Sequence, residues 1–186
     1  MDIREDLVRH YRWLRQYGYN DSHSGNASVR DSDKVWVTPT GACADTLAPE
    51  DLLACAIDGR CAQGVSLDAP LHICVYQQNP SARAVLHSHG PYSVSVTLKG
   101  EDFTPVDFEG QLYFPSVPVI TIPYEDYLRE SPHRVAAILT EHPITVVRGH
   151  GVYAQAQTLN LAYKWTCSLE QSAKTAYLAR QAGTIG

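Results

Sequence analysis

The sequence has no run of apolar residues close to the ~20 that a membrane-spanning helix needs, which argues against an integral membrane protein. It also has no block of Lys or Arg, and its 15 basic residues are outnumbered by 20 acidic ones, for a net charge of −5. A mildly acidic chain without a basic patch binds a phosphate backbone poorly, so we expect no nucleic-acid partner. The N-terminal residues lack the basic and then apolar pattern of a secretory signal, so we expect a cytoplasmic protein.

Cysteine is scarce, and its spacing forms no recognisable pattern. The number of cysteines is odd, and no C-x-x-C occurs. Both facts argue against a disulfide framework and against a zinc ribbon. We therefore expect a buried or idle thiol at each of the five positions, Cys43, Cys55, Cys61, Cys74 and Cys167.

The composition is that of a folded globular chain, with 44% hydrophobic and 19% charged residues among 186. This length predicts one domain, 1–186, and no repeat or linker divides it. Apolar periodicity and turn residues predict helices at 2–17, 68–78, 92–98, 132–141 (with Ser131 as N-cap) and 159–180. They predict a hairpin at 29–37, strands at 52–57, 82–89, 117–122 and 145–148, and otherwise a loop at 100–123. Such mixing favours an α/β or α+β sheet covered by helices.

Three of the eight histidines form a candidate metal site. His87 and His89 are two residues apart in a predicted strand, so their side chains share one face. His150 stands between two glycines just after another predicted strand, where binding groups are often displayed. Three imidazoles would leave an open coordination position on Zn²⁺, as in catalytic sites. The alternative is that His87 and His89 are ordinary strand histidines with hydrogen-bond partners inside the protein, and that the third histidine, His150, is unrelated to them.

Asp68 is the carboxylate of interest, because it begins a predicted helix close to His72. Its side chain would either cap that helix or act in acid/base chemistry. His72, one turn further on, is either a ligand or a histidine packed in an apolar run. The remaining histidines lie in polar or terminal contexts and are expected to be solvated: His10, His23, His133 and His142. Small-residue turns at 25–28 and 40–41 are able to expose amides to an anion.

Taken together, these motifs resemble the class II aldolase/adducin superfamily over residues 6–180. The resemblance rests on Gly-Asn-Ala-Ser-Val-Arg at 25–30, Val-Thr-Pro-Thr-Gly at 37–41, Asp68 with Pro-Leu-His at 70–72, Val-Leu-His-Ser-His at 85–89 and Arg-Gly-His-Gly at 148–151. Asp68 precedes His87 by 19 residues, which is the family's spacing between carboxylate and His-x-His. The resemblance implies an α/β fold whose central, mostly antiparallel sheet is covered by helices on both faces. It also implies a C4 homotetramer with active sites between subunits.

The resemblance assigns roles to individual residues. His87, His89 and His150 would bind Zn²⁺ or another divalent transition metal, and Asp68 would be the acid/base carboxylate, lying against the metal when substrate is absent. Four residues would cradle a substrate phosphate: Asn26, Thr40, Gly41 and Ser66. The mechanism, rather than the resemblance, suggests two further residues in the 100–123 loop: Tyr113 and Glu109 are candidates to protonate the leaving group, in this chain or from a neighbouring subunit. The alternative for Tyr113 is a packing residue.

Two departures from the family pattern stand next to each other at Ser66-Leu67-Asp68, where the aldolases have Ser-Ser-Glu. Leu67 cannot donate a hydrogen bond, so one phosphate contact is missing. Asp68 shortens the reach of the base by one methylene. The epimerase branch also has Asp here, but it relies on a longer C-terminal region than a chain ending at Gly186 supplies.

The implied function is that of a metal-dependent aldolase, an aldehyde-lyase of carbohydrate metabolism. It would cleave or form a C–C bond in a small ketose phosphate through a metal-stabilised enediolate. The same chemistry supports a sugar-phosphate dehydratase of the methylthioribulose-1-phosphate type, a decarboxylase or an epimerase, and the fold does not choose among them. A non-enzymatic alternative is an adducin-like interaction domain, against which the presence of all three histidines argues.

Overall fold

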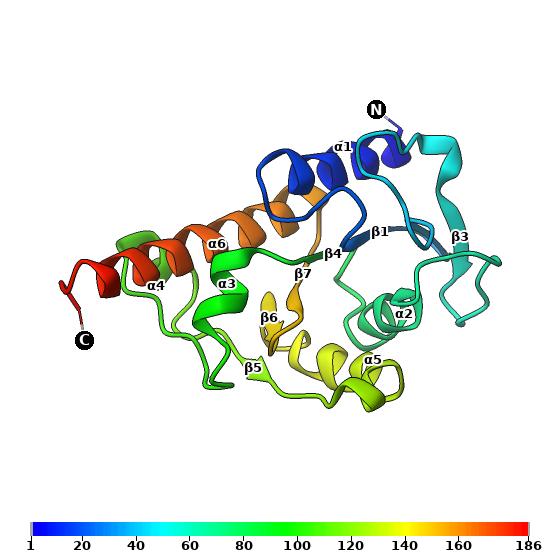
Figure 1. The fold of residues 1–186 in the computed structure, drawn as a ribbon. Coiled ribbons are helices and arrows are strands. Elements are labelled where there is room, and N and C mark those ends of the chain that lie inside the picture. The colour runs from blue at the N-terminus through cyan, green and yellow to red at the C-terminus, as the bar shows by residue number, and fades with distance from the viewer. Residues whose placement is uncertain (1, 186) are drawn as a thin grey trace.

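The architecture of the chain, seen in a computed structural model, consists of seven strands in one sheet with helices packed around it (Figure 1). The structure describes residues 2–185. The helices are α1 (Ile3–Gln16), α2 (Ala69–Gln78), α3 (Pro91–Val96), α4 (Phe108–Tyr113), α5 (Tyr127–Ile138) and α6 (Leu159–Gln181), with 3-10 turns η1 (Pro49–Asp51) and η2 (Tyr124–Asp126). The strands are β1 (Asn26–Asp31), β2 (Lys34–Val37), β3 (Leu53–Ala56), β4 (Ala84–Ser88), β5 (Val119–Ile120), β6 (Ile144–Val147) and β7 (Gly151–Ala156).

The sheet is mostly antiparallel, in the order β3-β2-β1-β4-β7-β6-β5. Only the pair β5 and β6, among the described residues, is parallel. The predicted hairpin is present as β1 and β2, joined at Ser32, which adopts a left-handed conformation with φ of 57°. The centre of the sheet is β4, which lies between β1 and β7 although its first residue is 53 positions after the last residue of β1.

Helices cover both faces of the sheet, and alternation along the strands explains why. In β4, Val85 packs with α2 and α5, whereas its neighbours Ala84 and Leu86 pack with α1 and α6. Successive side chains of a strand point to opposite faces, so a strand buried on both sides needs a helical layer on each. Figure 1 shows α1 and α6 along one side of the sheet and α2 and α5 along the other. The predicted fold class, a mixed α/β sheet flanked by helices, is confirmed.

Two details of the helix prediction are wrong. The helix predicted at 132–141 begins at Tyr127, so Ser131 is not its N-cap and Pro132 lies inside α5. Proline removes one backbone donor from a helix, and the packing of α5 against α2 outweighs that loss. The predicted loop at 100–123 contains α4, a single short helix whose N-cap Asp107 accepts a hydrogen bond from the backbone N–H of Gly110 (3.0 Å). The flanking prolines concealed this element in the sequence.

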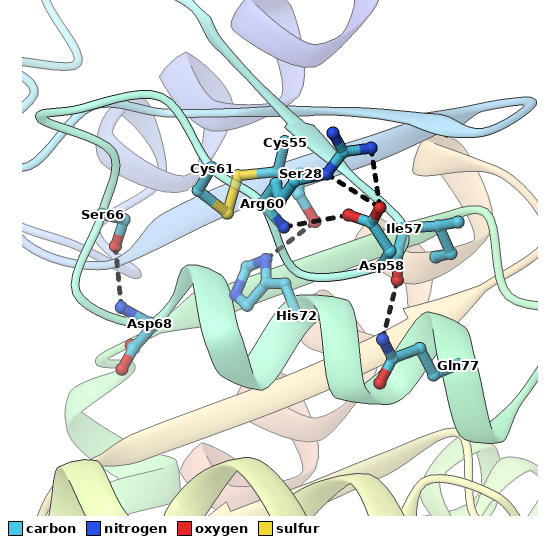
Figure 2. Close-up of a disulfide and its surroundings, with 10 residues drawn as sticks. All are labelled: Ser28, Cys55, Ile57, Asp58, Arg60, Cys61, Ser66, Asp68, His72 and Gln77. Carbon is cyan, nitrogen blue, oxygen red and sulfur yellow. Dashed lines mark hydrogen bonds and ion pairs between the residues drawn. A yellow bond between two sulfur atoms is a disulfide. The ribbon is translucent and has the colours of Figure 1, made fainter.

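The expectation of five unpaired thiols is also wrong, because Cys55 and Cys61 form a disulfide (Figure 2). The turn Asp58-Gly59 reverses the chain after β3, so that Cys61 pairs as a β-bridge with Cys55. Partners that face each other across such a bridge are close enough for a disulfide. The three free thiols are Cys43, Cys74 and Cys167.

His10, expected to be solvated, is 1% exposed. It belongs to the buried stripe of α1, and its ring packs against Trp13 (4.7 Å between centroids) and Tyr163 of α6 (5.7 Å). The amphipathic pattern of the helix therefore outweighs the polarity of the ring. Within residues 2–185, no helix is both long and apolar enough to cross a membrane.

Candidate metal and active site

Three adjacent strands place Asn26, His87 and Tyr153 in one row across the sheet. The register pairs Asn26 of β1 with His87 of β4, and His87 with Tyr153 of β7. Residues directly opposite each other in an antiparallel pair point to the same face. Tyr153 packs in the core layer beneath α2 and α5, so the row faces these two helices. The ring of Tyr153 stacks on that of His87, with centroids 4.0 Å apart and planes 2° from parallel.

The three predicted histidine ligands converge at the end of this row. His87 Nε2 lies 2.8 Å from His89 Nε2 and 3.3 Å from His150 Nε2, and one ligand atom from each residue lies within 4.8 Å of the other two. His87 Nδ1 lies 2.9 Å from the carbonyl oxygen of Val152, so Nδ1 carries the proton and Nε2 presents a lone pair. Three imidazole nitrogens directed at one point fit a divalent transition metal such as zinc and leave coordination positions open.

Local contacts explain how the two partners of His87 reach it. His89 follows β4, and its backbone N–H donates to the carbonyl oxygen of Tyr19 (2.9 Å) and to Asn20 Oδ1 (2.8 Å). His150 occupies the turn between β6 and β7, after Gly149, whose φ of +68° favours glycine. The turn and the end of β4 lie side by side because β4 and β7 are paired.

Gly151 has a packing role that leads to a testable prediction. A Cβ at this position would clash with the carbonyl oxygen of Ser88 and would lie 2.6 Å from His89 Cδ2 and 2.8 Å from His87 Cε1. We expect Gly151→Ala to displace these rings and to weaken metal binding at least about 10-fold, as loss of ligand support does elsewhere. Isothermal titration with Zn²⁺ measures this affinity.

Gly183→Ala is the control for this substitution. A Cβ at Gly183 meets nothing within 4 Å, although its φ of +68° is strained for alanine. It is expected to cost about 1 kcal/mol of stability and leave Zn²⁺ affinity unchanged. Equal Zn²⁺ affinities for the two variants would contradict the role given to Gly151.

Asp68 lies beside the histidines, and its carboxylate is held by three donors. Oδ2 accepts hydrogen bonds from Asn26 Nδ2 (2.9 Å) and from the hydroxyl of Tyr153 (2.8 Å), and Oδ1 accepts one from the hydroxyl of Tyr127 (3.0 Å). Asp68 Oδ2 is 3.9 Å from His87 Nε2. Although Asp68 is the N-cap residue of α2, its side chain makes no capping hydrogen bond. The capping interpretation of its side chain is therefore wrong, because the carboxylate faces the sheet.

Burial and hydrogen bonding set the charge states of the site. Burial raises the pKa of Asp68, but the nearby His87 and the hydrogen bond from Asn26 lower it by more. The net pKa is about 2, so the carboxylate is ionised. Burial lowers the pKa of His87 well below its ordinary value and, together with neighbouring His150, lowers that of His89 to about 4. Burial also lowers the pKa of His150. Neutral imidazoles are the form that binds a metal.

A cavity of about 570 Å³ opens onto this cluster. Its lining includes all three histidines, Asp68 and all four residues predicted to contact a phosphate, Asn26, Thr40, Gly41 and Ser66. Leu67 also lines the cavity with 68% of its surface exposed, where it offers an apolar side chain. The described residues that line the cavity include no Lys or Arg, so an anion there would meet neutral donors.

Two predicted residues lie elsewhere in the chain. Tyr113 belongs to α4, where its ring packs against Trp165 (5.9 Å between centroids) and under the ammonium of Lys164 (4.0 Å), and Glu109 is exposed on the same helix. Neither lines the cavity of its own chain, as far as residues 2–185 define it. Their predicted part in catalysis depends on a neighbouring subunit.

Two tyrosines that sequence reasoning missed contact Asp68 instead. The sequence pattern places Tyr127 in the segment before a helix, and Tyr153 in no element at all. The alternation that places Tyr153 beside His87 is visible only once β7 is known to pair with β4. No local signal marks Tyr127.

His72 is a buried packing residue in this structure. It is fully buried, and its Nδ1 lies 2.7 Å from Ser28 Oγ, which in turn contacts the hydroxyl of Tyr76 (2.7 Å; the His72–Ser28 contact is drawn in Figure 2). Burial lowers the pKa of His72 to about 4. It is not part of the three-histidine cluster.

The fold and this cluster together define a class II aldolase-type protein. The chain matches the family model "Class II Aldolase and Adducin N-terminal domain" over residues 5–177, and it belongs to that family. The predicted family is thereby confirmed.

Solved and curated relatives name more than one reaction. The crystal structure of L-fuculose-1-phosphate aldolase from Thermus thermophilus matches with a TM-score of 0.91 and 30% identity, covering 99% of this chain and 97% of that one. The L-fuculose phosphate aldolase of Methanococcus maripaludis is 26% identical over 183 residues, covering 96% of this chain and 97% of the relative. The 3-oxo-tetronate 4-phosphate decarboxylase of Escherichia coli is 28% identical over 189 residues, covering 95% and 86%.

Proposed function

We propose that this protein is a metal-dependent aldolase that cleaves or forms a C–C bond in a small ketose phosphate, and that the whole chain acts as one domain. The observation that supports it best is the convergence of His87, His89 and His150 beside an ionised, buried Asp68 at the base of a cavity. Perturbed titratable groups next to an open ligand set are typical of a catalytic site.

The residues that line the cavity have three proposed roles: metal binding, proton transfer and phosphate binding. His87, His89 and His150 would hold the cation, for which we propose Zn²⁺; when bound, it supplies Lewis-acid polarisation of a substrate carbonyl and stabilises an enediolate. Asp68 would take the proton of the substrate hydroxyl as the C–C bond breaks and the aldehyde forms, and would give that proton up to solvent before the next turnover. The phosphate would be contacted by four residues that line the cavity, Asn26, Thr40, Gly41 and Ser66. Leu67, which also lines the cavity, supplies no further hydrogen-bond donor from its side chain.

We further propose that the protein assembles as a homotetramer in the cytoplasm, and that each active site is completed by a neighbouring subunit. Tyr113 or Glu109 of an adjacent subunit would then protonate the leaving group. Phe108 and Leu112 project from the same helix, α4, and are 80% and 67% exposed. Apolar side chains of this size, exposed one turn apart, favour a subunit contact.

A disulfide such as Cys55–Cys61 is rare in the cytoplasm, and its presence there would require oxidising conditions.

A decarboxylase is the second candidate, because the Escherichia coli relative carries that name at similar identity. Loss of CO₂ from a 3-oxo acid phosphate also leaves an enediolate-type carbanion, so the same residues serve both reactions. A dehydratase of the methylthioribulose-1-phosphate type and an epimerase use related chemistry. An adducin-like interaction domain would need no open set of three histidines.

One experiment separates these candidates. The protein is reconstituted with Zn²⁺, its metal content is measured, and it is incubated with ketose 1-phosphates or with 3-oxo-tetronate 4-phosphate. We expect about one metal per chain and release of an aldehyde from a ketose 1-phosphate. CO₂ without aldehyde would make it a decarboxylase, and water loss without aldehyde a dehydratase. A metal content far below stoichiometric would favour the interaction domain. Light scattering on the same sample measures the assembly.

A further inference from the structure

Tyr11 carries a buried phenol that no step of the proposed function uses. It belongs to the buried stripe of α1 and is 1% exposed. Its ring packs in the core layer between α1 and the sheet, whereas its hydroxyl reaches two irregular segments of the main chain. Burial raises the pKa of this phenol to about 12, so the hydroxyl keeps its proton and acts as a donor.

Two turns of the chain meet at this hydroxyl. The carbonyl oxygens of Ser24 and Gly25 lie 3.3 and 3.4 Å from Tyr11 Oη, and the carbonyl oxygen of Ala42 lies 3.3 Å from it. One hydroxyl proton is therefore shared among three acceptors in two segments. Because none of the three acceptors lies in a helix or a strand, no regular hydrogen-bond ladder fixes these segments.

The same two turns carry three of the four residues that we propose to contact the phosphate. Asn26 directly follows the first turn, and Thr40 and Gly41 directly precede Ala42 in the second. All three line the cavity. Any change in the distance between the two turns would therefore change the distance between the groups that contact the phosphate.

Backbone N–H groups in these turns are available to an anion. Within residues 2–185, the N–H groups of Gly25 and Gly41 donate no hydrogen bond. The C=O and N–H of a trans peptide point in opposite directions, so the contact of the Ser24 carbonyl with Tyr11 directs the N–H of Gly25 away from the phenol. Amides held in this way bind anions well, because their ordering does not have to occur on binding.

We propose that Tyr11 is a positioning residue, which holds the two turns of the phosphate site at the spacing that the anion needs. This inference rests on the phosphate site of the proposed function. The described lining of the cavity contains no Lys or Arg, so the anion depends on neutral donors and on their alignment. Leu67 supplies no side-chain donor there, which makes each remaining contact more important.

The test measures the binding of inorganic phosphate to the Zn²⁺-loaded protein by ³¹P nuclear magnetic resonance. Tyr11→Phe removes only the hydroxyl group. We expect the Kd for phosphate to rise about 3- to 10-fold, the effect of losing a neutral hydrogen bond. We expect the Kd for Zn²⁺ to be unchanged. The KM for a ketose 1-phosphate should rise by the same factor as the Kd for phosphate, with little change in kcat.

Tyr76→Phe is the matched control, because it also removes a buried hydroxyl with a hydrogen-bond partner, Ser28 Oγ at 2.7 Å, outside the cavity lining. It should leave the Kd for phosphate unchanged even if thermal unfolding shows a loss of stability. Thr40→Ala removes a proposed phosphate contact itself and should weaken phosphate binding. In the double variant Tyr11→Phe with Thr40→Ala, the two effects should be less than additive, because the turn that Tyr11 holds has then lost a contact.

A measurement on the wild-type protein does not depend on whether Tyr11→Phe folds. Tyrosine is labelled with ¹³C at Cζ, the carbon that carries the hydroxyl. The Tyr11 resonance should shift as phosphate is added, whereas the Tyr76 resonance should not. A Tyr11 resonance that does not move, or a folded Tyr11→Phe with the wild-type Kd for phosphate, would overturn the positioning role.

The same experiments distinguish this inference from the proposed function. Phosphate binding that Thr40→Ala weakens and Tyr11→Phe does not would leave the phosphate site in place and remove Tyr11 from it. Failure of the wild-type protein to bind phosphate, or binding that Thr40→Ala leaves unchanged, would overturn the proposed phosphate site, and the role of Tyr11 with it.

Discussion

Asp68→Asn is expected to reduce kcat by about 10²- to 10⁴-fold, the range lost when a general acid/base is removed, while the protein still binds its metal. The substitution keeps the shape of the side chain and removes its charge and its basicity. In the proposed site, the imidazoles of His87, His89 and His150 would bind the metal without Asp68, whose Oδ2 lies 3.9 Å from His87 Nε2. The prediction therefore separates the base from the ligands.

Metal content, measured by mass spectrometry, and kcat in the aldehyde-trapping assay are the two readouts. Asp58→Asn is the matched control, because Asp58 pairs with Arg60 on the exposed hairpin after β3 (2.8 Å; Figure 2) and should not affect kcat. A variant with normal turnover would reduce Asp68 to a structural residue. A variant without metal would instead make Asp68 a ligand.

His150→Ala is expected to empty the metal site. With one of three imidazoles gone, the remaining pair supplies too few ligands for tight binding, and affinity should fall by more than about 100-fold, since loss of a residue that merely supports a ligand already costs 10- to 100-fold. Activity should disappear with the metal. The residue lies in the turn between β6 and β7 and is partly exposed, so the fold should survive.

Metal content after dialysis, together with a thermal unfolding curve, checks this expectation. His133→Ala is the control: His133 lies on α5, where its Nδ1 is 3.6 Å from Cys74 Sγ, well apart from the cluster. We expect wild-type metal content from the control. Full metal content in His150→Ala would mean that the cation is held elsewhere, and the proposed function would then lose its main support.

Local sequence patterns predicted most of the helices and strands. Apolar spacing located α1, α2 and α6 within one residue at each boundary, and turn residues located the β1–β2 hairpin. These elements are set by short-range effects, namely side-chain periodicity, caps and glycine turns. Where long-range packing competes, the prediction was wrong: α5 begins before Pro132, and Tyr127 at its first position packs against the core cluster to which α2 and α5 both contribute.

The same division holds for the site. The spacing of His87 and His89 already predicted a shared face, and their motif together with Gly-His-Gly at 149–151 predicted a third ligand. That His150 reaches the other two follows only from the pairing of β4 with β7. Tyr127 and Tyr153 had no signal of their own, because nothing in a tyrosine's neighbours reveals which carboxylate it will contact.

The amino-acid order thus settled which residue types were available: three histidines in turn or strand settings, one aspartate before a helix, and a chain of mixed α/β character. Which of them meet was decided by the sheet, whose register sets Asn26, His87 and Tyr153 in one row under Asp68. The Cys55–Cys61 disulfide is a local case: the two cysteines are six positions apart, and the turn between them places them face to face. The reason is physical: periodicity is a property of neighbours along the chain, whereas the strand pairs that build the site join distant residues, as Asn26 with His87 and His87 with Tyr153, which are 61 and 66 positions apart.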